Sequence, residues 1–397
     1  MSFKFTPFIL LCTSGLFAIF SSTISKSPVL PLFTAYLGAS PTGVGIIAGV
    51  SAFTGIIASI PSGIFSDKWG RKRMLVLSGI VFSIAPFLYL SVTKIWHLAL
   101  IRFFHGFATA IFIPVAMALV ADYFHEERGE KMGWFSMSTL VGRFLAPILG
   151  GSILGILAFN PSLSYKTVYL ICAIAGLVTL MLILRLPNPI VKESKGYSRK
   201  ELLESFRIVI TNKIILITCI VEASILFAYG TFETFLPLYS KSIGLTTYEI
   251  GIFLSSQIIT LALTKPLMGK FSDRHGRKLQ IFVGATIGSL CIGSFFFFKS
   301  FIPLFILSIL FGFCISIVTS ATSAFIADLS RENTRGSAMG TLGSIMDIGH
   351  TTGPIVAGIV ASSFGIGYSF IGAAVMLTVI AFVFLTGVMK RRSPQIT

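Results

Sequence analysis

Gly63-Ile-Phe-Ser-Asp67-Lys-Trp-Gly70-Arg71-Lys72 is followed 206 residues later by a near copy, Gly269-Lys-Phe-Ser-Asp273-Arg-His-Gly276-Arg277-Lys278. Further identities at this offset, or one residue beyond it, are Pro31 and Pro237, Gly45 and Gly251, Asp122 and Asp328, Gly142 and Gly349, Pro147 and Pro354, and Gly151 and Gly358. A nearly constant offset through many segments indicates internal duplication. The sequence therefore predicts two halves built to one plan.

The composition points to lipid as the solvent. Apolar residues make up 54% of the 397 residues and charged residues only 12%, and the mean hydropathy is +0.89. This excludes a soluble enzyme, a disordered chain, a collagen, a coiled coil and a disulfide-rich secreted scaffold. The five cysteines lie in apolar segments without metal-ligand spacing, so we interpret them as packing residues. The apolar N-terminal stretch lacks a cleavage site and is interpreted as a membrane span, not a signal peptide.

Apolar segments of about 20 residues are long enough to span a bilayer. The sequence predicts twelve, at approximately 7–33, 42–66, 74–94, 97–121, 132–158, 166–186, 213–239, 247–271, 278–298, 301–327, 336–362 and 367–389. The one long polar connection, 187–212, divides them six and six. We therefore expect an all-α membrane protein with two pseudo-symmetric six-helix bundles, 1–186 and 213–397, joined by a cytoplasmic linker. Parallel repeats of this kind are a transporter architecture.

The net charge of +16 has a topological explanation. Most of the 31 lysines and arginines lie at the termini and in every second connection, whereas the alternate connections carry only Lys94, Lys166, Lys241 and Lys299. This asymmetry follows the positive-inside rule and predicts that both termini are cytoplasmic. It gives no indication of nucleic-acid binding.

The duplicated loop places opposite charges at the ends of helices. Gly63 and Gly70 permit close packing and a tight turn, Asp67 and Arg71 supply the charges, and Asp122 is the expected partner of Arg71. Gly269, Asp273, Gly276, Arg277 and Asp328 repeat the arrangement. Such pairs would hold the cytoplasmic helix ends together in one conformation and part in another. The alternative is that these charges, Lys72 among them, only anchor the topology. A single copy would fit either interpretation, whereas two copies in register favour a gate.

The G-x-x-x-D-x-x-G-R-K loop in two copies resembles the signature of the major facilitator superfamily. Arg102-Phe-Phe-His-Gly106 is similar to that family's R-x-x-x-G element, and Phe232-Glu233-Thr234-x-x-Pro237-Leu-Tyr239 resembles its exporters. Gly142-x-x-x-Ala146-Pro147-x-x-Gly150-Gly151 resembles the G-x-x-x-G-P-x-x-G-G motif of the twelve-helix drug/proton antiporters, with Ala146 in place of a glycine and Arg143 as an unusual charge. The resemblance covers the whole chain and implies the twelve-helix fold of that superfamily.

Pro147 removes a helical hydrogen bond, and the glycines around it admit a neighbouring helix. We expect Gly142, Pro147 and Gly151 to form a kinked, tightly packed contact between the halves. The alternative is the ordinary small-residue packing of any membrane bundle.

Charges at membrane depth cost about 2.5–3.5 kcal/mol each on an insertion scale, so they mark candidate functional residues. They are Lys26, Arg102, Arg143, Glu222, Glu233, Lys265 and Asp347, with His105 and His350 as titratable neighbours. Depth counting at about 1.5 Å per residue places Arg143, Glu222 and Asp347 near the midplane and Lys26, Arg102 and Glu233 nearer the outer side. Glu222 and Glu233 share one helix face, as do Asp347 and His350. The duplication lets Lys26 face Glu233.

Some of these residues have simpler interpretations. Lys265 can reach the cytoplasmic interface with its long side chain, and Glu233 can be an outer-interface residue. Arg102 is a structural hydrogen-bonding centre or a proton-relay element, and His105 is more often a packed histidine than a proton carrier. For Arg143 and Glu222 a cavity role is favoured.

The chain carries no Walker loop, no HExxH and no GxSxG sequence, so we expect no enzyme, no metal and no cofactor. Transport would draw on a proton gradient. The leading hypothesis is a monomeric proton-coupled antiporter that exports small amphipathic molecules by alternating access across the inner membrane of a prokaryote. The alternatives are transport of an anionic or zwitterionic metabolite by the same fold, and a membrane receptor or scramblase without transport. Duplicate gate loops argue against the last class.

Overall fold

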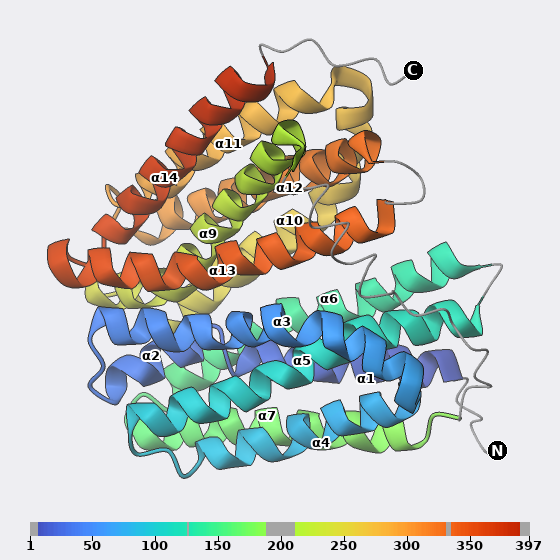
Figure 1. Ribbon diagram of the computed structural model, residues 1–397. Helices are drawn as coiled ribbons and strands as arrows, with labels where there is room; N and C mark the ends of the chain where they lie inside the picture. Colours follow the sequence, from blue (N-terminus) through green and yellow to red (C-terminus); the bar gives the residue numbers. More distant parts are fainter. Residues whose placement is uncertain (1–6, 125–126, 188–210, 331–334, 390–397) are drawn as a thin grey trace. The chain divides into compact units, whose positions relative to one another are not determined.

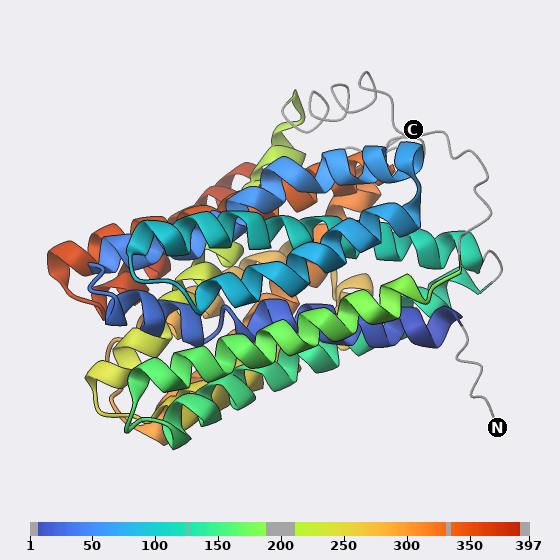
Figure 2. The same cartoon turned by 90° about the horizontal axis from the view of Figure 1, so that it is seen from below.

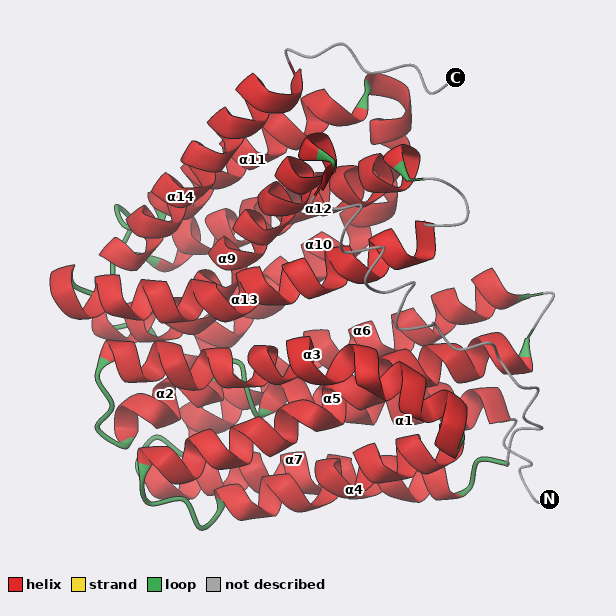
Figure 3. Cartoon of the chain, viewed as in Figure 1, coloured by secondary structure: helices red, strands yellow, loops and turns green. Residues whose placement is uncertain are grey.

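The computed structural model describes residues 7–124, 127–187, 211–330 and 335–389. Every regular element in these ranges is a helix, and the strand-free cartoon in Figure 3 agrees with the predicted all-α class. The helices are α1 (Pro7–Ile24), α2 (Val29–Tyr36), α3 (Pro41–Trp69), α4 (Arg71–Tyr89), α5 (Ile95–Tyr123), α6 (Arg128–Ile156), α7 (Pro161–Leu184), α9 (Lys213–Ser242), α10 (Thr247–His275), α11 (Arg277–Ser294), α12 (Phe301–Leu329), α13 (Arg335–Phe364) and α14 (Tyr368–Phe384), followed by a π-helical turn, Leu385–Met389.

Ten helical stretches in the described ranges are long and apolar enough to cross a membrane. They comprise α1 with α2, then α3 (as Pro41–Ala58), α4, α5, α6, α7, α9, α10, α12, and α14 extended to Met389. The helices α11 and α13 occupy the two remaining predicted spans but are not among these ten stretches. A twelve-span topology therefore stays a prediction.

The first predicted span is two helices instead of one. Its helix α1 ends at Ile24, and α2 begins at Val29 after a turn that contains Lys26. Pro28 has no N–H to donate to the preceding turn, so the α-helical ladder is interrupted there. Lys26 accordingly lies in a turn and not within a helix.

By its contacts the chain divides into two compact units, one of Met1–Gly196 with Ser240–Ser255 and one of Tyr197–Tyr239 with Ser256–Thr397. In the first unit α1 packs on α6 and α7, while α4 and α3 pack on α5 (Figure 1). The view from below shows the helices of this unit lying alongside one another (Figure 2). In the second unit α11 packs against α12 and α14. The predicted boundaries 1–186 and 213–397 remain a prediction.

The turns between helices recur in the two halves. Gly70 joins α3 to α4 with a φ of 95°, and Gly276 joins α10 to α11 with a φ of 91°. Because side-chain-bearing residues rarely adopt this left-handed backbone, glycine permits the chain to reverse directly before Arg71 and Arg277. The start of α10 is a capping box, in which Thr246 Oγ1 accepts from the Glu249 N–H (3.3 Å) and Glu249 Oε2 accepts from the Thr246 N–H (2.7 Å).

Glycine also sets the closest helix contacts within each unit. A Cβ built on Gly142 of α6 would overlap the carbonyl oxygen of Leu16 in α1, and one built on Gly349 of α13 would overlap that of Ala223 in α9. Both residues of the second pair lie 207 positions after those of the first. The same backbone-to-backbone approach is therefore used twice, once in each unit.

Candidate functional site

The loop motif of the first unit forms an ion pair. Arg71, the first residue of α4, places its Nε 3.1 Å from Asp122 Oδ2 near the end of α5. Its Nη1 also donates to Ser66 Oγ of α3 at 2.5 Å. The arginine is mostly buried, whereas Asp122 is 42% exposed. Three helix ends therefore meet at one guanidinium group. The surroundings of Gly63 and the side chain of Asp67 fall outside what the structure describes.

The second unit repeats this pair. Arg277 at the start of α11 is bonded through Nε to Asp328 of α12, and its Nη1 lies 2.9 Å from Asp273 Oδ1 of α10. Partial desolvation opposes the charge of Arg277, but the two carboxylates outweigh it and raise the pKa of this arginine above its ordinary value. The guanidinium therefore stays charged, and the linkage is released only by separating the helices.

The proline–glycine motif of α6 is packed inside the first unit. A Cβ on Gly151 would overlap the carbonyl oxygen of Thr247, and the hydroxyl of Thr247 donates to the carbonyl of Gly151 at 2.9 Å. One turn before Gly151 on α6, the carbonyl oxygen of Pro147 would lie 2.5 Å from a Cβ built on Gly251 of α10. Ser255 Oγ donates to Phe144 O at 2.8 Å. The segment Ser240–Ser255 is thus bonded along α6 as part of this unit.

Arg102 of α5 is the centre of a hydroxyl cluster in the same unit. Its side chain is 3% exposed and donates to Ser51 Oγ at 2.6 and 3.1 Å, to Ser25 Oγ at 3.2 Å and to Tyr89 Oη at 3.4 Å. Tyr89 also lies 3.3 Å from Nδ1 of His105. Within the described ranges the partners of Arg102 are hydroxyl groups, and none is a carboxylate. Among the residues that the structure describes, no neighbouring acid therefore balances the charge of this buried cation.

Glu222 of α9 is a fully buried carboxylate in the second unit. Its Oε2 accepts a hydrogen bond from Thr322 of α12, and its Oε1 has no hydrogen-bond partner among the described protein atoms. Burying a charged carboxylate with so few partners is costly, and the cost falls when the group binds a proton or a cation.

Glu233, eleven residues further along α9, meets another helix. It is 7% exposed, and its Oε2 lies 3.1 Å from His350 Nε2 of α13. The sequence placed Glu222 and Glu233 on one face of a helix, and the structure gives each a different partner along that face. The predicted approach of Lys26 to Glu233 joins residues of different units and stays a prediction.

The other candidates differ in exposure. Arg143 and Lys265 are exposed, Asp347 and Lys26 are half-buried, and Lys72 is half-buried at the start of α4. His105 is buried between Tyr89 and Phe82.

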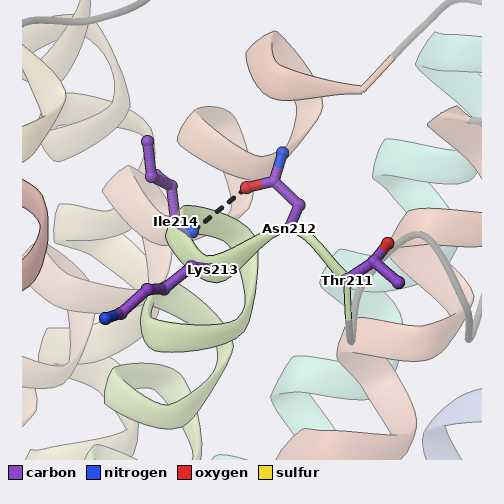
Figure 4. Close-up of a pocket in the computed structure, with 4 residues that line it drawn as sticks. All are labelled: Thr211, Asn212, Lys213 and Ile214. Carbon is purple, nitrogen blue, oxygen red and sulfur yellow. Dashed lines mark hydrogen bonds between the residues drawn. The ribbon is translucent and has the colours of Figure 1, made fainter.

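A surface pocket of about 410 Å³ lies at the start of α9, where Thr211, Asn212, Lys213 and Ile214 line it (Figure 4). Asn212 caps the helix there by accepting from the Ile214 N–H. None of the buried charged residues is among the four that line this pocket.

Sequence reasoning missed the neutral partners of these charges, namely Ser25, Ser51, Tyr89 and Thr322. Hydroxyl residues are common in membrane helices, so the presence of a serine, threonine or tyrosine in the sequence does not by itself identify a partner of a buried charge. A comparison of equivalent positions in the two halves could have singled out Thr322, because the first half has Ala116 there.

The sequence model of the Major Facilitator Superfamily matches residues 11–260 and 243–397 of this chain. The chain belongs to the major facilitator superfamily. The duplicated arginine–aspartate linkage and the helical fold described above are thus features of a major facilitator transporter.

Several curated relatives in this superfamily are named as drug-resistance proteins. The chain is 28% identical to multidrug resistance protein MdtG of Klebsiella pneumoniae, over 85% of this chain and 83% of the relative. It is 24% identical to multidrug resistance protein 2 of Bacillus subtilis, over 94% and 93%. An uncharacterised MFS-type transporter of Methanocaldococcus jannaschii is 25% identical, over 90% and 92%.

Solved structures of other transporters share the fold of this chain. A bacterial homologue of the human lysosomal transporter Spinster, in an inward-facing and occupied conformation, superposes with a TM-score of 0.81 at 18% identity and covers 98% of both chains. The nucleoside transporter NupG superposes with a TM-score of 0.80 at 17% identity, covering 98% of this chain and all of its own. At such identities the likeness extends to the major facilitator fold alone.

Proposed function

We propose that this major facilitator transporter exports small amphipathic molecules in exchange for protons. The observation that supports it best is the pair of buried carboxylates on α9, Glu222 and Glu233, held by a hydroxyl and a histidine. Groups of this kind can take up and release a proton at little structural cost, since the partner Thr322 or His350 can act as donor or acceptor. The names of the drug-resistance relatives support export.

The energy of a proton gradient is sufficient for this task. A driving potential of about 150 mV is worth roughly 3.5 kcal/mol per proton. At about 1.4 kcal/mol per decade, that supports a concentration gradient of roughly a few hundredfold for each proton exchanged. Export against a moderate drug gradient therefore needs a single coupled proton.

In this proposal the two arginine–aspartate linkages close the cytoplasmic side. The protein lies, in this proposal, in the inner membrane of a prokaryotic cell with both termini, and with them the Arg71 and Arg277 ends of the helices, on the cytoplasmic side. The positive-inside asymmetry supports this orientation. The linkages hold the helix ends together while the opposite side is open, and they part when the cytoplasmic side opens. The twelve spans and the pseudo-symmetry of the halves belong to this proposal.

The experiment is transport in everted membrane vesicles with ethidium as substrate and an internal pH probe. We expect ethidium accumulation to require the gradient, to release protons from the vesicle and to vanish with Glu233→Gln. Accumulation that survives collapse of the proton gradient would contradict the coupling, and failure of ethidium and of a panel of other amphipathic dyes to move would contradict drug export.

A second candidate substrate class rests on Arg102. A buried guanidinium that contacts only hydroxyl groups in the described ranges retains capacity for a negative partner, which favours anionic or zwitterionic amphiphiles. Binding of an anionic dye to the protein in detergent tests this candidate. Exclusive affinity for cations such as ethidium would exclude it.

A further inference from the structure

Three helices of the second unit, α9, α10 and α12, carry buried polar atoms that make no hydrogen bond within the described ranges. They lie on α12 and its neighbours, and all are at most 3% exposed. In the described ranges the following have no hydrogen-bond partner: Ser316 Oγ, Thr319 Oγ1, Gln257 Nε2 and Glu222 Oε1. Buried polar atoms are nearly always satisfied, so four in one region point to partners other than protein.

Hydroxyl groups in helices ordinarily bond to the carbonyl one turn earlier. Two serines of the same helix do so, since Ser308 donates to Leu304 O at 2.8 Å and Ser330 donates to Ile326 O at 2.7 Å. Ser316 and Thr319 do not make this bond. Their hydroxyls are therefore available to other partners, in contrast to the self-satisfied serines of α12.

These atoms form a continuous row. Thr322 contacts Glu222, and a Cβ on Gly312 would overlap the carbonyl oxygen of Gln257, so the row is bounded by Glu222 and Gln257. Between these ends stand Ser316 and Thr319, at helical intervals of three and four residues from Gly312 to Thr322. Such intervals correspond to an axial rise of roughly 4.5–6 Å between successive residues. The hydroxyls of Ser316 and Thr319 make no direct hydrogen bond to one another, and a bridging water could join polar groups spaced in this way. We call the three hydroxyl residues Ser316, Thr319 and Thr322, together with the side-chain amide of Gln257, the hydroxyl row.

The Gln257 end of the row lies at the level of the second buried carboxylate. Phe311, beside Gly312, is in ring contact with Phe232 at 5.2 Å, and Phe232 precedes Glu233. Because α9 and α12 are antiparallel, as the contacts Glu222–Thr322 and Phe232–Phe311 require, the row extends between the levels of Glu233 and Glu222.

The first half shows that the fold does not need these polar groups. Its positions equivalent to Ser316, Thr319 and Thr322 are Ala110, Ile113 and Ala116. The position equivalent to Glu222, by the offset that the Gly142 and Gly349 contacts establish, is Gly15. At these positions the first unit has apolar residues or glycine, whereas Ser51, the equivalent of Gln257, is polar. The hydroxyls of Ser316, Thr319 and Thr322 and the carboxylate of Glu222 therefore serve a purpose beyond packing.

We propose that the hydroxyl row holds a file of ordered water molecules that conducts protons between the Glu233–His350 pair and Glu222. In one passage a proton leaves the protonated Glu233–His350 pair, each water accepts one proton and donates another, and Oε1 of Glu222 receives the last. No other bond changes. This deepens the proposed function, because it names the route by which a coupled proton reaches the inner carboxylate.

The charged and titratable groups on the surrounding helices are few. Cys219 stands one turn away on α9, Lys265 of α10 interacts electrostatically with Glu222, and Asp347 lies on α13 close to the Gly349 contact. On α12 the only charged residue is Asp328 in the arginine–aspartate linkage. The Cys314 thiol is buried on the same helix, two positions before Ser316. A proton that moves along α12 toward Glu222 therefore meets hydroxyls and this thiol, and no other carboxylic acid of that helix on the way.

The test is a pH jump on the purified full-length chain in liposomes, followed by infrared absorption of protonated carboxyl groups. The Glu222 band is assigned by its loss in Glu222→Gln. We expect Ser316→Ala and Thr319→Val to reach the same final amplitude at least about tenfold more slowly, the rate factor for a barrier raised by about 1.4 kcal/mol. Thr319→Ser, which restores a hydroxyl, should recover the rate.

The matched control is Ser308→Ala, which removes an equally buried hydroxyl of α12 that bonds within its own helix. Its rate should equal that of the unaltered chain. Unchanged rates in Ser316→Ala and Thr319→Val, or no Glu222 band between pH 5 and 9, would overturn the water file. Because the measurement needs no substrate, a failure of ethidium transport would contradict drug export and leave this result standing.

Discussion

His350 Nε2 lies 3.1 Å from Glu233 Oε2, so a titratable base of α13 is in direct contact with a buried carboxylate of α9. The two groups can share one proton, and the contact changes character when that proton leaves. A helix-to-helix contact that depends on protonation is what coupling between a gradient and a conformational change requires.

Glu233→Gln should abolish gradient-driven accumulation while retaining substrate binding, because the amide mimics a permanently protonated acid. The expected gradient of a few hundredfold per proton should collapse to near unity. Ethidium uptake by everted vesicles measures accumulation, and equilibrium binding in detergent measures affinity. Glu130→Gln, at an exposed carboxylate of α6, is the control. A Glu233→Gln protein that still pumps with unchanged pH dependence would remove Glu233 from the coupling site.

Asp122→Asn combined with Asp328→Asn should shift the population toward states open at the Arg71 and Arg277 ends. Exposed ion pairs contribute about 0.2–1 kcal/mol each, so loss of both is expected to change the equilibrium by up to roughly 30-fold. Accessibility of single cysteines placed near these ends reports the shift. Glu127→Gln, which removes an ion pair to Lys131 within one short stretch of chain, should leave labelling unchanged. Normal labelling and normal flux in the double variant would exclude a gate.

Gly349→Ala should destabilise the protein, because the added methyl group overlaps the carbonyl oxygen of Ala223. Overpacking of this kind typically costs about 1–3 kcal/mol. The control on the same helix is Gly343→Ala, where no atom lies within 4 Å of the new methyl group; there, alanine should be neutral or slightly stabilising. Thermal unfolding midpoints in detergent compare the two, and equal midpoints would refute the close contact.

Arg102→Lys keeps the positive charge but loses the planar guanidinium group, whose N–H donors reach Ser25, Ser51 and Tyr89 together. If the cluster recognises anionic amphiphiles, the affinity for an anionic dye should fall by at least about tenfold, the value of one charge-assisted hydrogen bond. Ethidium binding should change little. Arg128→Lys, at an exposed arginine, is the control. Undiminished binding of the anionic dye to Arg102→Lys would assign the cluster a structural role.

The sequence anticipated features that depend on spacing along the chain. The helical class follows from composition, and the pairing of Arg71 with Asp122 follows from opposite charges at neighbouring helix ends. The recurrence of that pairing at Arg277 and Asp328 follows from the constant offset. Local rules suffice for such contacts, because glycine turns and helix termini bring the groups together.

Other features depend on helix register, which a single sequence does not reveal. Thr322 meets Glu222 from 100 residues away, and Ser51 meets Arg102 from 51 residues away. Rotation of either helix by one residue would separate these partners. The break between α1 and α2 was missed because the apolar stretches on either side of Ser25–Pro28 were joined into one span, although the Pro28 ring removes the hydrogen-bond donor that a continuous helix needs.

The bonding of Ser240–Ser255 into the first unit has a consequence for biosynthesis. Thr247, whose hydroxyl bonds to Gly151, is synthesised 96 residues after it. At a translation rate of about 5–20 residues per second, the ribosome needs roughly 5–20 s to supply that segment. During this interval the Gly151 face of α6 is without its native neighbour, so the insertion machinery or surrounding lipid must cover it until the first unit can be completed.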